Sequence, residues 1–261
     1  MHPELFSIGN FTIHTYGFMI MIGASLGFFY MTSSAKKELG IERDKIQNLA
    51  ILIIIAAFVG GKLFFFMENP SYYFGSFQNM KNNFRTGFVF YGSLLFAIPI
   101  TVWFFKKEKW PLWAMMDRLA ITACIIHAFG RMGCFFAGCC HGIPTDMPWG
   151  VTFTDAATKA NPMNTALHPT QLYSSFMIIG ILAILWMMKR HNRFEGQLFF
   201  LYIILYATGR SIIEIFRGDE ARGYVIEGLV SHSQFISIVV IAITIFAYMR
   251  FKKKAGLKTK N

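Results

Sequence analysis

Residues 169–188 read PTQLYSSFMIIGILAILWMM and contain no formally charged side chain. A helix needs about 20 predominantly apolar residues to cross the hydrocarbon core of a bilayer. Its backbone groups must then form hydrogen bonds within the segment, because lipid offers them no partners. This stretch therefore predicts a transmembrane helix.

Six other segments of the chain have the same character. Of the 261 residues, 54% are hydrophobic and 15% are charged, whereas about 25% of residues in soluble domains are charged. We predict an all-α membrane protein with about seven transmembrane helices and a single integral membrane domain over residues 1–261. The predicted spans are approximately 14–34, 46–67, 87–105, 112–129, 169–188, 197–216 and 229–249.

Basic residues alternate between the predicted loops. If the N-terminus is periplasmic or external, most of the 25 lysines and arginines lie in cytoplasmic loops and in the C-terminal tail. Short cytoplasmic loops are enriched in these residues, so the pattern predicts an external N-terminus and a cytoplasmic C-terminus. The net charge of +11 then reflects basic loops beside an anionic lipid leaflet, and we expect no nucleic-acid partner.

Four polar residues, Tyr206, Arg210, Glu214 and Arg217, close the sixth predicted span. Their spacing of three or four residues places them on one helix face. Ionisable groups inside a membrane each cost roughly 2.5–3.5 kcal/mol and usually face a partner or a cavity. One interpretation is a structural ion triad near the outer interface. The other is an arginine pair that binds an anion, with Glu214 holding one arginine, because a guanidinium group matches phosphate.

The fourth predicted span ends in a glycine-rich segment that contains Arg131. Gly130 and Gly133 flank the arginine, His127 lies one turn before it, and Gly138 and Gly142 follow further along the chain. Glycines at this density are unfavourable in a long helix. We therefore expect a backbone that bends closely around a ligand.

All four cysteines lie between Cys124 and Cys140. Cys134, Cys139 and Cys140, followed by His141, are residue types that bind zinc, but their order lacks the paired C-x2-C spacing of structural zinc sites. We expect no metal here and interpret the cysteines as packing around the arginine loop. Acylation or disulfide formation on the external face are the alternatives.

Several of these segments occur together in one known family. They are Gly130-Arg131-Met-Gly133, the external His168-Pro-Thr-Gln171-Leu-Tyr173 and the Arg210–Glu214–Arg217 stripe. With them the chain resembles a prolipoprotein diacylglyceryl transferase. The resemblance covers nearly the whole chain, from Tyr16-Gly17 through Asp117-Arg118 and Trp149-Gly150-Val151 to Ser231-His-Ser-Gln234.

The resemblance implies an activity and its partners. Enzymes of this family transfer the sn-1,2-diacylglyceryl group from phosphatidylglycerol to the lipobox cysteine of preprolipoproteins and release glycerol-1-phosphate. The implied partners are phosphatidylglycerol, lipobox-containing preprolipoproteins and membrane lipid, with no cofactor and no metal. The implied location is the bacterial cytoplasmic (inner) membrane, which the chain would cross several times.

The resemblance also implies site residues. Arg131 and Arg210 match the family's essential arginines, and Tyr16, Tyr206, Glu214 and Gly142 match further functional positions. The chain departs from the family pattern at three places. Cys134 stands where the family usually has Asn, Cys139 stands where it usually has Glu, and its His-Gly-Gly segment reads Tyr91-Gly92-Ser93 here.

We expect Arg131 and Arg210 to stabilise the charge that grows on a leaving phosphate. Glu214 would orient Arg210, and Tyr206 or Tyr91 would hydrogen-bond the head group. His127, His168 and His141 are candidate general bases, because histidine accepts protons near neutral pH. The predicted substrate-binding positions are Tyr16, Tyr91, Gly92, Gly130, Gly133, Cys134, Cys139, Gly142, Gln171 and Arg217. Residues 143–168 are expected to form a small external cap over this site.

Two other functions remain open at this level. A divergent member of the family would bind anionic phospholipid with altered or no transferase activity, as the departures at Tyr91 and Cys139 suggest. A lipid or anion transporter also places arginines inside the membrane, but such folds usually contain internal repeats. We find no repeat in this sequence.

Overall fold

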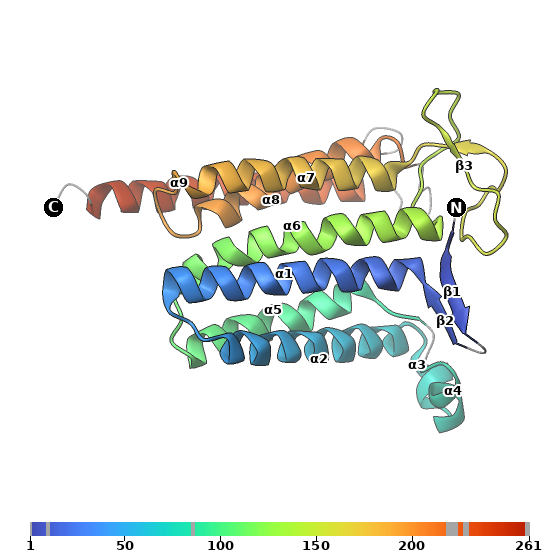
Figure 1. Ribbon diagram of the computed structural model, residues 1–261, viewed down its shortest axis with the longest axis horizontal. Coiled ribbons are helices and arrows are strands. Elements are labelled where there is room, and N and C mark those ends of the chain that lie inside the picture. Colours follow the sequence, from blue (N-terminus) through green and yellow to red (C-terminus); the bar gives the residue numbers. More distant parts are fainter. Residues whose placement is uncertain (1, 9–10, 85–86, 218–223, 227–229, 259–261) are drawn as a thin grey trace. The chain divides into compact units, whose positions relative to one another are not determined.

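The computed structural model describes residues 2–8, 11–84, 87–217, 224–226 and 230–258. Long helices make up most of this part of the chain, and short strands and helices connect several of them (Figure 1). The elements in chain order are β1 (Glu4–Ile8), β2 (Phe11–His14), α1 (Thr15–Leu39), α2 (Arg43–Glu68), α3 (Pro70–Phe74), α4 (Phe77–Asn82), α5 (Phe90–Lys107), α6 (Leu112–Ala137), β3 (Val151–Thr152), β4 (Ala166–Leu167), α7 (Thr170–Lys189), α8 (Gln197–Glu214), β5 (Tyr224–Ile226), β6 (Val230–Ser231) and α9 (His232–Lys258).

Five helices in the described residues are long and apolar enough to cross a membrane, namely α1, α2, α6, α7 and α9. The predicted all-α class is therefore confirmed; the strands among the described residues pair into two-stranded antiparallel sheets. Helices α5 and α8 are not among the five. Each has 18 residues, a length of about 27 Å, slightly less than the thickness of a typical hydrocarbon core. Seven spans and the orientation of the termini stay predictions.

Several predicted boundaries differ from the structure. Helix α1 ends at Leu39 instead of residue 34, and α9 ends at Lys258 instead of residue 249. Helix α6 continues to Ala137, past the predicted end at residue 129, because a membrane helix tolerates glycines in its interior. Helix α9 begins at His232. The predicted start of the last span, Leu229, lies outside the described residues.

The chain forms two compact units. One contains Met1–Met31 and Met116–Asn261, and the other contains Thr32–Met115. The core of the first unit joins α6, α7 and the beginning of α8, and its fully or nearly fully buried side chains include Ile121, Ile178 and Leu198.

In the second unit, α2 packs against α5 at two glycines. A Cβ atom on Gly92 would lie 2.5 Å from the carbonyl oxygen of Gly60, and one on Gly60 would lie 2.3 Å from the carbonyl oxygen of Gly92. The two backbones are therefore in direct contact, which a larger side chain would prevent. Nearby, the ammonium group of buried Lys62 donates a hydrogen bond of 2.8 Å to the carbonyl oxygen of Gly87.

Residues 143–168, predicted as a cap, form an ordered segment with a small core of its own. Strands β3 and β4 pair antiparallel, with Val151 opposite Leu167. Phe153, Ala160 and Leu167 are buried together. The backbone N–H of Lys159 donates to the carbonyl oxygen of Ala137 at 2.9 Å, which ties the segment to the end of α6. That it covers the site stays a prediction.

Asp117 links α6 to the start of α8. Its carboxylate accepts hydrogen bonds of 2.9 Å from the backbone N–H groups of Gly196 and Phe199, and one of 3.2 Å from the Asn192 side chain. The first N–H groups of a helix have no partner within the helix. Asp117 therefore caps α8 and fixes where this helix begins against α6.

We expect Asp117→Ala to lower the free energy of unfolding by about 2–4 kcal/mol, because buried N–H groups lose a charged acceptor. Asp117→Asn keeps an oxygen acceptor and is expected to lose less. Thermal unfolding of the purified protein in detergent measures both, with exposed Asp146→Ala as the control. An unfolding midpoint for Asp117→Ala equal to that of Asp146→Ala would show that the cap is unimportant.

Candidate active site

Arg131 lies in the last two turns of α6, one turn after His127. Its Nε–H donates a hydrogen bond of 3.1 Å to Nε2 of His127. The helix continues through Gly130 and Gly133, so the backbone does not bend at these two of the four glycines. The bend comes at Gly138, whose φ of +70° lies in the left-handed region that favours glycine.

Arg210 and Glu214 form an ion pair one turn apart near the end of α8. Their side chains are 14% and 8% exposed, so both charges lie away from bulk solvent. One turn before Arg210, the ring of Tyr206 contacts the ring of His127, with centroids 5.4 Å apart. Buried charges of this kind are stable only when they are paired, and here each helps to neutralise the other.

The contact between Tyr206 and His127 aligns the two arginines. Helices α6 and α8 belong to the same unit and run in the same direction (Figure 1). Arg131 follows His127 by four residues and Arg210 follows Tyr206 by four residues, so both arginines lie one turn beyond the contact. The structure thus brings Arg131, Arg210, Glu214, Tyr206 and His127 into one region.

Tyr16, at the start of α1, lies against the same part of α6. A Cβ atom on Gly133 would lie 3.1 Å from the Tyr16 ring and from its carbonyl oxygen. Further along, positions Gly23 and Gly27 leave room for Phe129 and Ile126 of α6. Glycines on both helices therefore allow close packing that places Tyr16 against Gly133, two residues after Arg131.

Arg217 does not continue the α8 helix, in contrast to the predicted stripe. Helix α8 ends at Glu214, and the N–H of Arg217 bonds to the Glu214 carbonyl at 3.1 Å in a tighter turn. The turn places the Phe216 carbonyl oxygen beside Gly142, where it accepts a hydrogen bond of 3.0 Å from the N–H of Ile143. Arg217 is 8% exposed and remains close to the site.

His168 is held by a chain of side-chain hydrogen bonds at the start of α7. Its Nδ1 lies 3.0 Å from the hydroxyl of Tyr173, which accepts a bond of 2.7 Å from the indole N–H of Trp149. Because the Tyr173 oxygen accepts from Trp149, its own proton is free to bond to Nδ1 of His168. Tyr173 and Trp149 were named in the sequence motifs but not as site residues, since their contact joins segments distant in sequence.

Each candidate base has a hydrogen-bonding partner at one ring nitrogen, and His141 has one at both. Nε2 of His127 accepts from Arg131, and Nε2 of His141 lies 3.3 Å from the N–H of Asn161. Nδ1 of His141 lies 3.0 Å from the Gly142 carbonyl oxygen. A general base needs a free lone pair directed at its substrate. In this arrangement these histidines position neighbouring groups, and the role of base stays a prediction for each.

The loop after α6 is fixed by the first residues of α7. Thr170 Oγ1 donates to the Cys140 carbonyl oxygen at 2.7 Å, and Gln171 Nε2 donates to the Cys139 carbonyl oxygen at 2.8 Å. Cys140 has a φ of +62°, which costs a residue with a Cβ about 1–2 kcal/mol. Gln171 is fully buried. Gln171 therefore has an observed structural role, and its contact with the substrate stays a prediction. Thr170 is a second anchor of this loop, which the sequence did not single out.

Cys140 lies among thiols and guanidinium groups. Hydrogen bonds with Cys134 and Cys139, together with the positive charges of Arg217 and Arg131, lower the pKa of the Cys140 thiol below its ordinary value. A thiolate is the nucleophilic and metal-binding form of cysteine. The electrostatics at the end of α6 therefore favour an anion beside these arginines.

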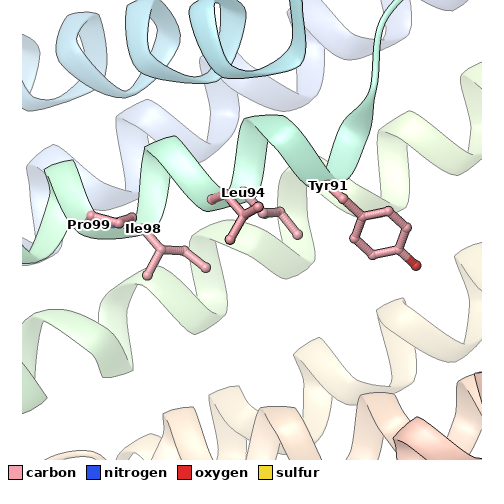
Figure 2. Close-up of a pocket in the computed structure, with 5 residues that line it drawn as sticks. Tyr91, Leu94, Ile98 and Pro99 are labelled. Carbon is pink, nitrogen blue, oxygen red and sulfur yellow. The ribbon is translucent and has the colours of Figure 1, made fainter. Parts of the chain in front are cut away.

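Tyr91 and Gly92 lie on α5, in the second unit, so their participation in the site around Arg131 stays a prediction. Tyr91 is exposed and lines a hollow of about 350 Å³ together with apolar residues of the same helix (Figure 2). These neighbours are Leu94, Leu95, Ile98 and Pro99. The hollow offers apolar contacts and one phenol, which suits a hydrocarbon chain better than a phosphate. Gly92 has the packing role described above.

The chain is similar in sequence to proteins of one known family. A sequence model of prolipoprotein diacylglyceryl transferase matches residues 3–250. The chain belongs to the prolipoprotein diacylglyceryl transferase family. It is 37% identical to the phosphatidylglycerol–prolipoprotein diacylglyceryl transferase of Clostridium tetani over 97% of this chain and 100% of that protein.

Two further relatives also align over nearly the whole of this chain. The phosphatidylglycerol–prolipoprotein diacylglyceryl transferase 2 of Clostridium perfringens is 32% identical over 99% of both chains. The transferase of the same name from Clostridioides difficile is 30% identical over 97% of both chains. The family predicted from the sequence motifs is confirmed, and the matches extend across both units of the fold.

Proposed function

We propose that this chain transfers the sn-1,2-diacylglyceryl group of phosphatidylglycerol to the lipobox cysteine of preprolipoproteins. The cysteine sulfur attacks the diacylglyceryl carbon bonded to the phosphate oxygen, and a carbon–sulfur bond replaces the carbon–oxygen bond. Glycerol-1-phosphate leaves with the electron pair of the broken bond, and the thiol releases one proton. The names and coverage of the relatives support this proposal.

The observation that carries the proposal is the pair of arginines at one level of α6 and α8. Arg131 is held by His127, and Arg210 is held by Glu214. Fixed donors directed at developing negative charge lower a barrier most where water is excluded. The low exposure of Arg210 and Glu214 meets that condition.

The proposal includes a membrane topology. All seven long helices cross the bacterial cytoplasmic (inner) membrane, with the N-terminus outside. The end of α6, the end of α8 and residues 143–168 then lie at the external side, where preprolipoproteins arrive. Basic residues in the last turns of α1, α5 and α7 support this orientation.

The direct test uses purified protein in mixed micelles with phosphatidylglycerol and a lipobox peptide. We expect the peptide to gain one diacylglyceryl group and glycerol-1-phosphate to appear in equal amount. A peptide with serine in place of the lipobox cysteine, and micelles containing only phosphatidylethanolamine, are the controls. Binding of phosphatidylglycerol without any transfer would instead favour a lipid-binding member of the family, the alternative suggested by Tyr91 and Cys139.

Gly130 offers a narrower prediction. No atom of the described residues lies within 4 Å of the position that its Cβ would occupy. Gly130→Ala should therefore fold normally, with a helix-propensity gain of up to about 1 kcal/mol. If the phosphate lies beside Arg131, the added methyl group enters the space of the substrate, and we expect transfer to fall by about tenfold or more.

The matched control is Gly180→Ala, because Gly180 in α7 is equally free of neighbours and lies outside the site. Initial rates of peptide modification and the midpoint of thermal unfolding distinguish the two variants. Equal activity in Gly130→Ala and Gly180→Ala would place the substrate elsewhere.

A further inference from the structure

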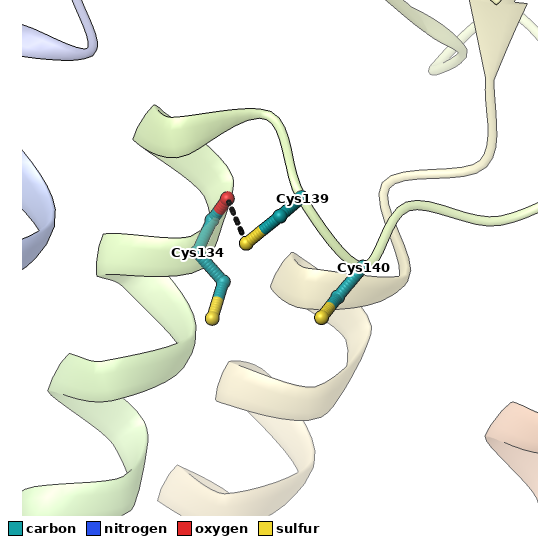
Figure 3. Close-up of side chains that lie close together, drawn as sticks. All are labelled: Cys134, Cys139 and Cys140. Atoms are coloured by element: carbon teal, nitrogen blue, oxygen red, sulfur yellow. Dashed lines mark hydrogen bonds between the residues drawn. The ribbon is translucent and has the colours of Figure 1, made fainter. Parts of the chain in front are cut away.

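Three thiols, two of them from consecutive residues, meet at the end of α6. The Sγ atoms of Cys134, Cys139 and Cys140 all lie within 4.8 Å of one another. Cys134 projects from the helix, and the other two follow the left-handed turn at Gly138 (Figure 3). All three are partly exposed and unbridged, so an ion from solution can reach them.

The loop holds these thiols in place before any ligand binds. Thr170 and Gln171 of α7 fix the carbonyl groups of Cys140 and Cys139, respectively. The Cys139 thiol also donates to the Cys134 carbonyl oxygen at 3.8 Å, the contact drawn in Figure 3. The backbone of Cys140 has a positive φ, a conformation that residues other than glycine rarely adopt. Uncommon backbone conformations of this kind occur often where a ligand is held.

We propose that Cys134, Cys139 and Cys140 form a binding site for a thiophilic divalent metal ion of the Zn²⁺ class. Thiolates are the ligands that such ions prefer. Sulfurs bound to one zinc at about 2.3 Å lie about 3.8 Å apart, so the observed cluster needs only small rotations of the side chains. The three thiols release their protons when the ion binds.

The surroundings complete the site in two ways. Both ring nitrogens of His141 already have hydrogen-bonding partners, so a water molecule takes the fourth position. Three thiolates and a divalent ion leave one negative charge, and the charges of Arg217 and Arg131 act on Cys140 from close by. The expectation of no metal came from spacing along the chain. The turn at Gly138 brings the thiols together without a C-x2-C pair.

This inference does not rest on the proposed transferase activity, because its test measures binding. The purified full-length protein, kept reduced with a phosphine, is titrated with Zn²⁺ and with Cd²⁺. We expect one ion per chain, an ultraviolet thiolate-to-cadmium absorption band, and protection of three of the four cysteines from alkylation.

Single Cys→Ser variants identify the ligands. Replacing Cys134, Cys139 or Cys140 removes a direct ligand and should weaken metal binding by more than about 100-fold. Losing a residue that only supports a ligand costs roughly 10–100-fold. Cys124→Ala is the matched control, since Cys124 is buried in the core of α6 and lies outside the cluster. Thr170→Val, which releases the Cys140 carbonyl group, should weaken binding by about 10–100-fold.

Three results would overturn the proposal. They are the absence of stoichiometric binding in the reduced protein, binding that survives replacement of all three cysteines, and binding that Cys124→Ala abolishes while the cluster variants retain it. Circular dichroism of each variant separates loss of a ligand from loss of the fold. If a cluster variant unfolds, protection of the wild-type thiols from alkylation by the ion still decides the question.

Discussion

Arg131→Ala is expected to lower the rate of diacylglyceryl transfer by about 10²–10³-fold, the usual cost of removing one fixed donor that stabilises an anionic transition state. The guanidinium group lies on α6 and its Nε–H is committed to His127. The remaining N–H donors are available to a phosphate. Alanine removes these donors and leaves His127 without its partner, while α6 retains good helix propensity.

Arg210→Ala is expected to lower the rate of diacylglyceryl transfer by a similar factor, and it should also lower the stability of the protein. Glu214 would remain 8% exposed and without its cation, and an unpaired buried charge is strongly unfavourable. We therefore expect Arg210→Ala to lose stability as well as activity, and the double variant Arg210→Ala/Glu214→Gln to recover stability without activity. This difference separates the structural role of the ion pair from the role of the arginine toward substrate.

Rates of peptide modification at saturating phosphatidylglycerol, together with unfolding midpoints, decide this prediction. Arg193→Ala is the matched control, because its side chain is exposed in the loop before α8. Arg131→Lys should recover only part of the activity, since lysine keeps the charge but loses the planar fork of donors. Activity in Arg131→Ala comparable to that of Arg193→Ala would remove Arg131 from the mechanism.

Much of the helical fold follows from local properties of the chain. Uncharged stretches long enough to span a bilayer, such as 169–188, correspond closely to observed helices such as α7. The i,i+4 relation between Arg210 and Glu214 also follows from helix geometry alone, and the structure shows the ion pair. These features depend on residues a few positions apart, so the sequence is sufficient to predict them.

Features that depend on contacts between distant segments were harder to predict. Glycine content suggested a bend over the segment from Gly130 to Gly142, but close packing of Gly133 against Tyr16 shows that this glycine serves a helix–helix contact. The Cys134 cluster was judged by its spacing, whereas its geometry depends on a turn held by Thr170 and Gln171. Such requirements come from tertiary structure and have no local signature.

Gly142→Ala is expected to abolish most activity and to destabilise the end of the first unit that contains the cysteine loop. A Cβ atom at this position would lie 2.1 Å from the Phe216 carbonyl oxygen and 2.8 Å from side-chain carbons of His168 and Thr170. The closest atom belongs to the backbone, which cannot move aside as a flexible side chain can. The loop after α6 and the turn after α8 must therefore separate.

That separation breaks two backbone hydrogen bonds. The N–H of Gly142 donates to the His168 carbonyl at 2.8 Å, and the N–H of Ile143 donates to the Phe216 carbonyl at 3.0 Å. Overpacking of this kind costs about 1–3 kcal/mol. It also displaces Arg217, which adjoins Phe216, relative to the cysteine loop, so activity should fall further than stability alone explains.

Unfolding midpoints and transfer rates of Gly142→Ala, measured beside Gly180→Ala, test the argument. Both changes add one methyl group, but only the one at Gly142 meets a neighbouring atom. If Gly142→Ala unfolds at the wild-type temperature and keeps its activity, the end of α8 and the cysteine loop cannot be in the contact described. The contacts among the end of α6, the start of α7 and the end of α8 would then have to be revised.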